Sequence, residues 1–266
     1  MPQYRIGAHT YIFAQLGYDE DAQFDEIFDI VAAAGFQAIE LNKPLIGFAN
    51  AKQRIDAALA RTGLQLVGAS NGYALWDKSQ EETIRADARQ HAERLAQWPG
   101  MKSGTSSGGK RFAERTEEEN AQVIKMWTEL GHMYRDRGVM LNFHTHGEPE
   151  EDIRLVVESV PADVLKLGPD LDWLRVGGVD PMAFVEEHAD RLCMLHIRDY
   201  HLGGARTEAL GEGDADYAAL GKLLDQVGFR GDFVVELAIP GAEPTKPVEE
   251  MLRLSVEHLK QTIGEW

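Results

Sequence analysis

The stretch RDRGVMLNFHTHGE, residues 135–148, contains the unit from which the fold of this chain is inferred. A polar helix end leads through Gly138, a residue type that commonly terminates helices, into the short apolar run Val139–His144. Polar residues capable of chemistry follow as soon as that run ends. The same order of helix, glycine and strand recurs at residues 58–69 (ALARTGLQLVGA) and 225–237 (DQVGFRGDFVVEL). The sequence therefore predicts repeated helix–strand units.

Short apolar runs bounded by glycine, proline or polar residues predict seven strands. They are Tyr4–His9, Phe36–Leu41, Leu64–Ala69, Val139–His144, Val164–Leu167, Leu192–Ile197 and Phe233–Leu237. An eighth strand is expected between Gln97 and Ser103, although WPGMKSG has poor strand propensity. Amphipathic runs predict eight helices. They are Ala22–Ala34, Ala49–Arg61, Glu81–Gln97, Glu117–Arg137, Glu150–Val157, Met182–His188, Tyr217–Gln226 and Pro247–Thr262.

This alternation favours a single (β/α)8 TIM barrel domain spanning residues 1–266. Eight units in a chain of this length average about 33 residues each, close to the usual barrel repeat. A doubly wound sheet is the competing architecture, and it usually carries a glycine-rich phosphate loop after its first strand. Here the first strand is followed by TYIFAQLGYDE, which lacks such a loop. The barrel predicts an active site at the carboxyl-terminal ends of the strands.

Composition excludes several classes of protein. The chain has 27 Lys and Arg against 44 Asp and Glu, a net charge of −17, which argues against binding nucleic acid or anionic membrane. The single cysteine, Cys193, rules out an internal disulfide and is interpreted as a packing residue. The N-terminus lacks the pattern of a signal peptide, and no apolar run reaches the ~18 residues of a membrane span. We therefore expect a cytoplasmic protein.

Ionisable side chains gather where predicted strands end. Because side chains alternate along a strand, Asn142, His144 and His146 should share one face, which suits a metal or a sugar. Loop histidines on the surface are the alternative interpretation.

Three further strands repeat this pattern. Asp170 follows the sixth strand, where it could instead cap a turn, and His196 and Arg198 end the seventh. Glu236 lies among apolar residues of the eighth, where leaving it unpaired would be costly.

The second strand adds Glu40 and Asn42 on one face. Oxygen-rich sets with one or two imidazoles suit Mn²⁺, Mg²⁺, Co²⁺ or Zn²⁺. Such a cation could polarise a carbonyl as a Lewis acid while a neighbouring His or Glu moves a proton.

Six segments together resemble the sugar phosphate isomerase/epimerase superfamily, the xylose isomerase-like TIM barrels. They are GFQAIEL, LNFHTHGE, GPDLDWLRVGGVDP, RLCMLHIRDY, LGEGDADY and FRGDFVVEL. The resemblance covers nearly the whole chain and is best from Gly138 to Glu236. Its nearest branch by motif is that of the inosose dehydratases, which have His-x-His on the fifth strand.

The resemblance implies one divalent metal ion, for which Mn²⁺ is the first expectation. Family members usually hold it with Glu, Asp, His and Glu, which carries over to Asp170, His196 and Glu236. The first ligand departs from the usual pattern, and Glu148 is our choice, with His144 as the alternative.

The resemblance also suggests roles for the other residues. His144, His146 and Glu236 are the candidate catalytic groups. The candidate substrate contacts are His9, Glu40, Asn142, Trp173, Arg198 and Glu212. Trp173 stands where family members often have His, and it could form an apolar wall against a sugar. Glu212 could reach the site, or its loop could simply be a turn leading to a helix cap. The polar run Ser103–Lys110 could serve as a lid.

Our first functional hypothesis is a metal-dependent enzyme that abstracts a proton next to the carbonyl of a sugar, keto-sugar or cyclitol. The outcome would be isomerisation, epimerisation or β-elimination. The His-x-His motif on the fifth strand, which differs from the usual family pattern, slightly favours a dehydratase. A zinc phosphodiesterase of the endonuclease IV type is the second hypothesis, although the net charge of −17 counts against it. A non-catalytic sugar-binding or partner subunit is the third. The expected partner is a small sugar or cyclitol, and a homo-oligomer is compatible with the sequence.

Overall fold

The computed structural model describes residues 4–239 and 243–266, and its centre is a sheet of eight parallel strands. The strands are β1 (Arg5–His9), β2 (Ala38–Asn42), β3 (Gln65–Gly72), β4 (Lys102–Ser106), β5 (Met140–Phe143), β6 (Lys166–Leu167), β7 (Met194–Ile197) and β8 (Asp232–Val235). Strands from β1 to β6 pair in chain order, and β8 pairs with both β7 and β1.

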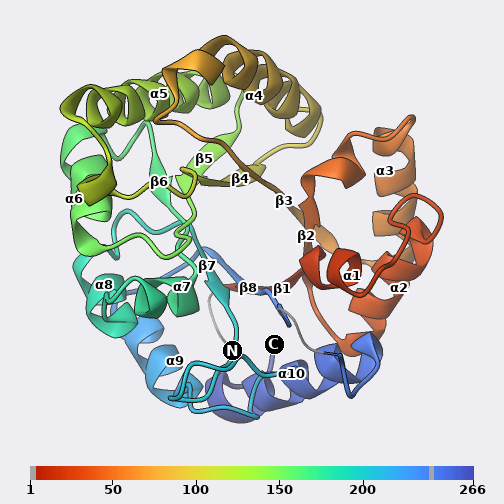
Figure 1. The fold of residues 1–266 in the computed structure, drawn as a ribbon. Helices are drawn as coiled ribbons and strands as arrows, with labels where there is room; N and C mark the ends of the chain where they lie inside the picture. Colours follow the sequence, from red (N-terminus) through yellow and green to blue (C-terminus); the bar gives the residue numbers. More distant parts are fainter. Residues whose placement is uncertain (1–3, 240–242) are drawn as a thin grey trace.

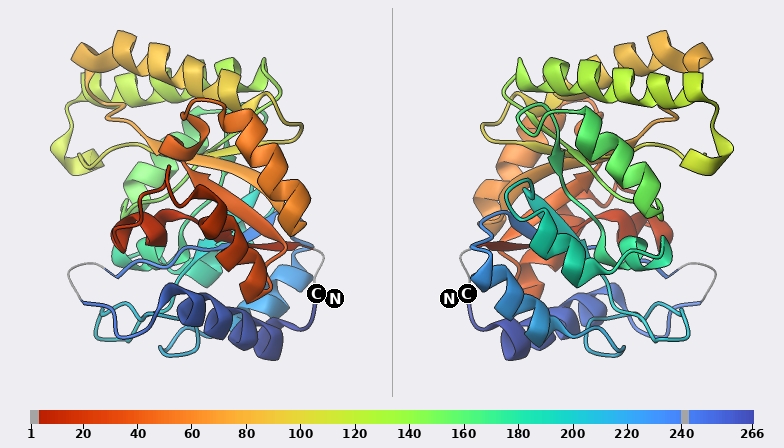
Figure 2. Two further views of the ribbon diagram at one scale, coloured as in Figure 1. Left: turned by 90° about the vertical axis from the view of Figure 1, so that its right-hand side faces the viewer. Right: turned by 90° about the vertical axis from the view of Figure 1, so that its left-hand side faces the viewer.

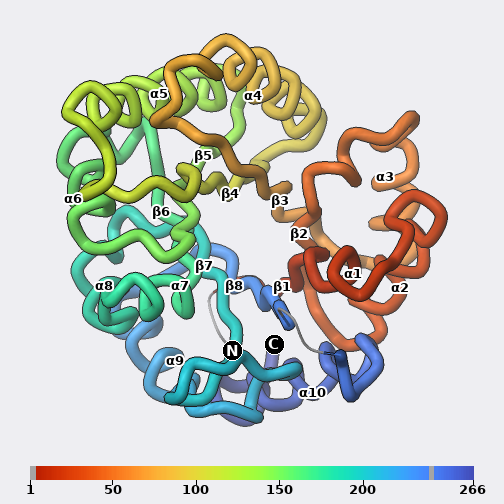
Figure 3. The backbone as a smooth tube through the Cα atoms, in the orientation of Figure 1, coloured from red at the N-terminus to blue at the C-terminus, as the bar shows by residue number. Residues whose placement is uncertain are grey.

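Single bridges close the remaining seam between β6 and β7. Leu167 pairs with Leu192 and Asp170 pairs with His196, and the Cys193 amide donates to the Leu167 carbonyl oxygen at 2.9 Å. Figure 1 looks along the nearly closed barrel, and the tube in Figure 3 follows the chain around it in one circuit from red to blue. The predicted (β/α)8 barrel is confirmed, and the doubly wound alternative is wrong.

Helices form an outer layer around the strands (Figure 2). They are α1 (Tyr11–Gln15), α2 (Phe24–Ala34), α3 (Ala51–Thr62), α4 (Glu81–Leu95), α5 (Glu117–Arg135), α6 (Glu150–Ser159), α7 (Leu171–Val176), α8 (Pro181–Glu187), α9 (Tyr217–Gln226) and α10 (Val248–Ile263), with 3₁₀ turns η1 (Lys43–Ile46), η2 (Lys78–Gln80) and η3 (Phe112–Glu114). The last helix, α10, packs against α2 and α9 and so completes the ring. Within the described ranges, none of these helices is long and apolar enough to cross a membrane.

The alternation of side chains along the strands separates the outer core from a polar barrel mouth. On β5, Phe143 packs outwards against Trp127 of α5, with ring centroids 5.3 Å apart. Towards the axis, Ala38, Met194 and Val234 belong to a separate small apolar cluster. Each precedes by two positions an ionisable residue of β2, β7 or β8, so it shares that residue's face. This cluster therefore forms an apolar floor beneath the ionisable groups.

The eighth predicted strand lies later in the chain than expected. It is β4, and its register against β3 depends on Gly68, because a Cβ there would lie 1.8 Å from the Lys102 carbonyl oxygen. Ser103 and Thr105 are buried in β4, and Thr105 donates a hydrogen bond to Asn71 at 2.6 Å. The first half of the predicted lid is therefore a barrel strand, and prediction from polarity failed there because these small polar side chains bond across the sheet. The short helices α1 and α7 were also not predicted.

Candidate metal centre and active site

Imidazole and carboxylate side chains from β2, β7 and the ends of β5 and β8 meet at the mouth of the barrel. His196 Nε2 lies 2.5 Å from Glu40 Oε2, and His196 Nδ1 lies 2.8 Å from His144 Nδ1 and 3.3 Å from Glu236 Oε2. His144, His196 and Glu236 each place one ligand atom within 4.8 Å of the others. In the part of the chain that the structure describes, no other group of His, Cys, Asp or Glu meets this criterion.

The two histidines hold different charges at neutral pH. Burial alone would lower the pKa of His196, but the adjacent Glu40 and Glu236 carboxylates raise it to about 9. Burial holds the pKa of His144 well below its usual range, so this ring is neutral. The contact between the two Nδ1 atoms is then a hydrogen bond donated by the His196 imidazolium. A single proton thus occupies the space between two metal-type ligands.

Arg198 provides a second positive charge at the cluster. Its guanidinium forms an ion pair with Asp170, and its Nη2 lies 3.2 Å from Glu236 Oε2. Burial alone would raise the pKa of Glu236, but the positive charges of Arg198 and His196 hold it well below its usual range. Asp170 also caps α7, accepting the Trp173 amide at 3.0 Å, so the alternative interpretation of this residue as a cap is confirmed, and its role as a metal ligand stays a prediction. The three residues form a buried charged unit beside His196.

The donor set fits a divalent cation. Three buried oxygen atoms at the cluster, Glu40 Oε1, Asn142 Oδ1 and Glu236 Oε2, accept no hydrogen bond from the described residues. Leaving such atoms unpaired is costly, and a bound cation would satisfy those it reaches. Imidazole nitrogens and carboxylate oxygens are ligands suited to Mn²⁺, Co²⁺ and Zn²⁺. His144, His196 and Glu236 are therefore the residues that could hold the ion, with Asp170 next to them.

The cluster lies at one side of a pocket of about 420 Å³. Its lining includes five predicted site residues, namely His9, His144, His196, Arg198 and Glu236. His9 Nδ1 accepts the Tyr11 amide at 3.0 Å, so its Nε2 carries the proton and donates to Ser70 Oγ at 2.8 Å. His9 is thus held as a neutral donor, and burial lowers its pKa in agreement with that state.

His146 and Trp173 line the pocket next to His144. Their ring centroids are 4.2 Å apart, and both residues line the pocket. The backbone of His146 is clamped on both sides, because its N–H donates to Glu148 and its carbonyl oxygen accepts from Arg111 at 2.6 Å. Arg111 in turn pairs with Glu148 at 3.1 Å. Burial lowers the pKa of His146, so a neutral imidazole in a fixed position faces the pocket.

Comparison with known proteins agrees with this architecture. A sequence model of the xylose isomerase-like TIM barrel family matches residues 28–262. The chain belongs to this family. The predicted resemblance is therefore confirmed.

Individual relatives within and around this family are distant in sequence. The chain is 25% identical over 275 residues to an inosose dehydratase of Geobacillus thermodenitrificans, covering 91% of this chain and 90% of that protein. Its fold is similar to D-psicose 3-epimerase of Clostridium cellulolyticum H10, with a TM-score of 0.77, 13% identity and coverage of 97% and 99%. It is also similar to 3-keto-D-glucoside 4-epimerase of E. coli, with a TM-score of 0.75, 20% identity and the same coverage.

We call His144, His196 and Glu236 the metal-type cluster. Two predicted site residues of this xylose isomerase-like barrel lie apart from it. Glu148 is buried, but its carboxylate is occupied by Arg111 and by the His146 amide rather than directed at His196. His144, the alternative first ligand, is the residue that the structure brings to the cluster. Glu212 accepts the Ala209 amide at 3.2 Å and pairs with Lys246 at 2.8 Å, so it secures a loop and does not line the pocket.

Asn142 and Glu40 lie beneath the pocket rather than at its surface. Asn142 is fully buried and donates to Met194 Sδ at 3.2 Å, and Glu40 contacts the pocket only through His196. Gly168 makes room for Asn142, because a Cβ there would lie 2.0 Å from Asn142 Oδ1. These two residues support the cluster from below, whereas substrate contact was predicted for both.

Several pocket residues of this family member were not among the predicted site residues. Ser70 lies two residues before the end of β3, and Arg206 lies in the loop after β7. Ser70 could have been found from its place at a strand end, next to Asn71. Arg206 gives no such signal, because its loop position is set by a bridge to Tyr200 that only the fold reveals.

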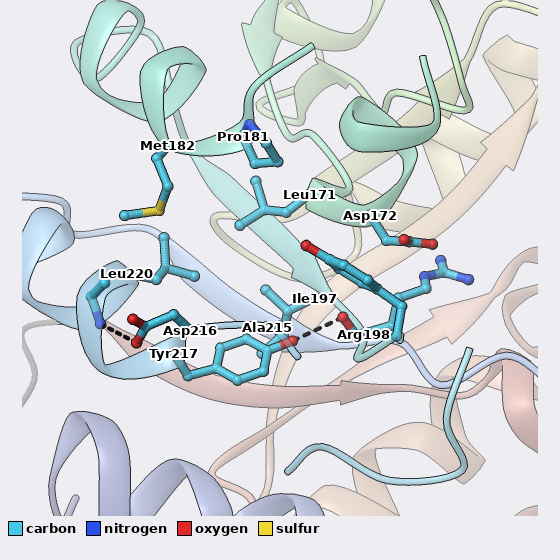
Figure 4. Close-up of a pocket in the computed structure, with 12 residues that line it drawn as sticks. Leu171, Asp172, Pro181, Met182, Ile197, Arg198, Ala215, Asp216, Tyr217 and Leu220 are labelled. Atoms are coloured by element: carbon cyan, nitrogen blue, oxygen red, sulfur yellow. Dashed lines mark hydrogen bonds between the residues drawn. The ribbon is translucent and has the colours of Figure 1, made fainter. Parts of the chain in front are cut away.

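A second, smaller cavity of about 140 Å³ lies outside the barrel wall between β7 and helices α7, α8 and α9 (Figure 4). Its lining is mainly apolar and includes Leu171, Met182 and Leu220. The Tyr217 hydroxyl donates to the Arg198 carbonyl oxygen at 2.9 Å from this side. This cavity therefore backs the strand end that carries Arg198.

Cys193 lies elsewhere in the barrel, where burial raises the pKa of its thiol to about 12 and leaves it unreactive at neutral pH, as expected of a packing residue.

Proposed function

We propose that this chain is a divalent-metal-dependent enzyme that removes a proton from the carbon next to a carbonyl group of a sugar, keto-sugar or cyclitol. The observation that carries the proposal is the group of three ligand atoms within 4.8 Å of one another, which borders a 420 Å³ pocket. Pockets of about 300 Å³ and above accommodate small-molecule ligands, so a monosaccharide fits. The names of the relatives, a dehydratase of inosose and epimerases of D-psicose and 3-keto-D-glucoside, support carbohydrate chemistry.

His144, His196 and Glu236 would hold the cation, with Asp170 as a further ligand if Arg198 releases it. Mn²⁺ is our first choice, and Mg²⁺, Co²⁺ and Zn²⁺ are the alternatives. When bound, a divalent ion supplies a Lewis acid that stabilises negative charge on a carbonyl oxygen. Binding requires that His196 lose its proton, since a metal-bound imidazole is neutral.

His146 is the proposed proton acceptor. Its ring is neutral, lines the pocket and makes no side-chain hydrogen bond to the described residues, so a nitrogen is free to take a proton. The backbone clamp formed by Glu148 and Arg111 fixes where that nitrogen lies. His9, which donates to Ser70, is placed to donate to a substrate oxygen instead. Proton transfer by a positioned side chain accelerates such reactions by about 10²- to 10⁴-fold.

The experiment is exchange of solvent deuterium into a panel of keto-sugars and cyclitol ketones, followed by proton NMR. The metal-loaded protein should exchange the hydrogen next to the carbonyl, and EDTA should stop it. His146→Gln removes the proposed proton acceptor and should slow exchange by at least about 100-fold, while Glu257→Gln, an exposed site on α10, serves as the matched control. Absence of deuterium uptake across the panel would overturn the proposal.

A further inference from the structure

Arg206 is held in one position at the pocket by three independent contacts. Its backbone forms an antiparallel bridge to Tyr200, and its guanidinium carbon lies 4.4 Å from the centre of the Trp173 ring. Its Nε donates to Asp172 Oδ2 at 2.8 Å. The Asp172 carboxylate is completely buried, and 12% of the Arg206 side chain is exposed. A long side chain that is normally mobile is therefore already ordered.

Arg206 shares its carboxylate partner with Arg175, and its two terminal amino groups are unused among the described residues. Asp172 is shared, because its Oδ1 accepts from Arg175 Nη2 at 2.7 Å while its Oδ2 accepts from Arg206. Two guanidinium groups thus face one carboxylate, and one positive charge is left over. The two terminal amino groups of Arg206 make no hydrogen bond within residues 4–239 and 243–266, although the residue lines the 420 Å³ pocket. An ordered guanidinium with free terminal donors is suited to an oxyanion ligand.

A continuous series of side chains leads from the candidate metal centre to this guanidinium. The ring of His144 lies 6.3 Å from that of His146, which lies 4.2 Å from that of Trp173, on whose face Arg206 lies. A sugar ring placed along this wall would have one end at the metal-type cluster and its other end at Arg206. Trp173 therefore lies between His146 and Arg206 in this series, and all three residues line the pocket.

The remaining surroundings favour a carboxylate over a phosphate. The helix that begins at this wall is α7, and its N-terminal amide at Trp173 is already occupied by the Asp170 carboxylate. That amide is therefore not free for a phosphate, whereas phosphate sites normally offer free amides at a helix N-terminus. A single planar carboxylate matches the two free amino groups of one guanidinium.

We infer that Arg206, held by Asp172 and Trp173, binds the carboxylate of a sugar acid whose carbonyl end lies at the metal-type cluster. The inference rests on the proposed function for the orientation of the substrate, and it narrows the substrate class to uronates, aldonates or their keto forms. It makes Arg206 the specificity-determining residue and leaves the chemistry at the other end of the pocket unchanged.

The test is calorimetric binding of matched ligands to the purified full-length protein. The ligands are D-glucuronate, D-galacturonate and D-gluconate, each with its uncharged counterpart, and the 6-phosphates of glucose and galactose. At least one acid should bind about 10- to 100-fold more tightly than its counterpart, the range expected for a hydrogen-bonded charged pair. Arg206→Gln should abolish that preference while changing the affinity for uncharged sugars by less than about twofold, which also shows that the variant is folded.

Arg175→Gln is the matched control, because it removes the other guanidinium from the same carboxylate without touching the pocket. It should keep the preference for the acid. Equal binding of acids and uncharged sugars, or a preference that survives Arg206→Gln, would overturn the inference, and tighter binding of the phosphates would overturn the choice of carboxylate. Because binding is measured without turnover, a failure here is distinct from a failure of deuterium exchange.

Discussion

Replacing Glu40 with glutamine removes the negative charge that lies 2.5 Å from His196 Nε2 but keeps an oxygen that can accept its hydrogen bond. Both side chains are 1% exposed, so solvent screens the pair little. The neighbouring carboxylates raise the pKa of His196 from 6.5 to about 9 in spite of its burial. That rise corresponds to about 3 kcal/mol of folding free energy when His196 is charged.

The raised pKa of His196 determines how the free energy of unfolding changes with pH. A raised pKa in the folded protein stabilises the fold fully below the unfolded value of 6.5, and the contribution is lost as pH rises through about 9. In metal-free protein, Glu40→Gln should therefore reduce the free energy of unfolding by up to about 3 kcal/mol at pH 6. The difference from the original protein should shrink or reverse at pH 10, where His196 is neutral in both.

Urea unfolding at pH 6 and pH 10, followed by circular dichroism after EDTA treatment, measures the effect. NMR titration of ¹⁵N-labelled histidines assigns it to His196, whose pKa should fall in the variant. Glu257→Gln is the same substitution at an exposed site, and it should neither destabilise the protein at pH 6 nor change the pKa of His196. Equal destabilisation at both pH values, or an unchanged His196 titration, would refute the reasoning.

Two further predictions concern the packing that supports the pocket. Burial lowers the pKa of His91 to about 4, so its stabilising contribution is present above pH 6.5 and lost as pH falls through 4. His91→Gln should remove up to about 3 kcal/mol of the pH dependence of unfolding between pH 7 and pH 4, and an unchanged slope would count against it. Gly168→Ala would bring a Cβ to 2.0 Å from Asn142 Oδ1 and should destabilise the protein by about 1–3 kcal/mol in thermal unfolding. Gly109→Ala, where a Cβ meets nothing within 4 Å, should be neutral, and equal melting temperatures of the two variants would contradict the packing account.

The order of elements was predictable because most strands are short apolar runs and most helices are amphipathic runs, each recognisable in the sequence alone. Helix α9 begins and ends at the predicted residues, since Tyr217–Gln226 has a clear amphipathic run. Strand β4 was misplaced because its small polar residues resemble a loop, and they are stable in the barrel only through partners such as Asn71. Helix α7 is only six residues long, too short for a periodic pattern to reveal.

The candidate site was predictable where side chains end strands on the inward face. His196 and Glu236 followed from alternation, and the structure brings them together with His144. The position of Glu148 did not follow, because Arg111, 37 residues away in the chain, binds its carboxylate. Arg206 was missed for a similar reason, since its partners Asp172 and Trp173 lie on a helix that the sequence did not indicate.

We expect a divalent cation to replace the proton between His144 and His196 when it binds. Titration calorimetry of Mn²⁺ into metal-free protein at pH 7.5, repeated in two buffers of different ionisation enthalpy, counts both bound ions and released protons. We expect about one ion per chain and release of about one proton, because the pKa of His196 is about 9 and a metal-bound imidazole is neutral. Binding without proton release, or binding that survives Glu236→Gln unchanged, would contradict it.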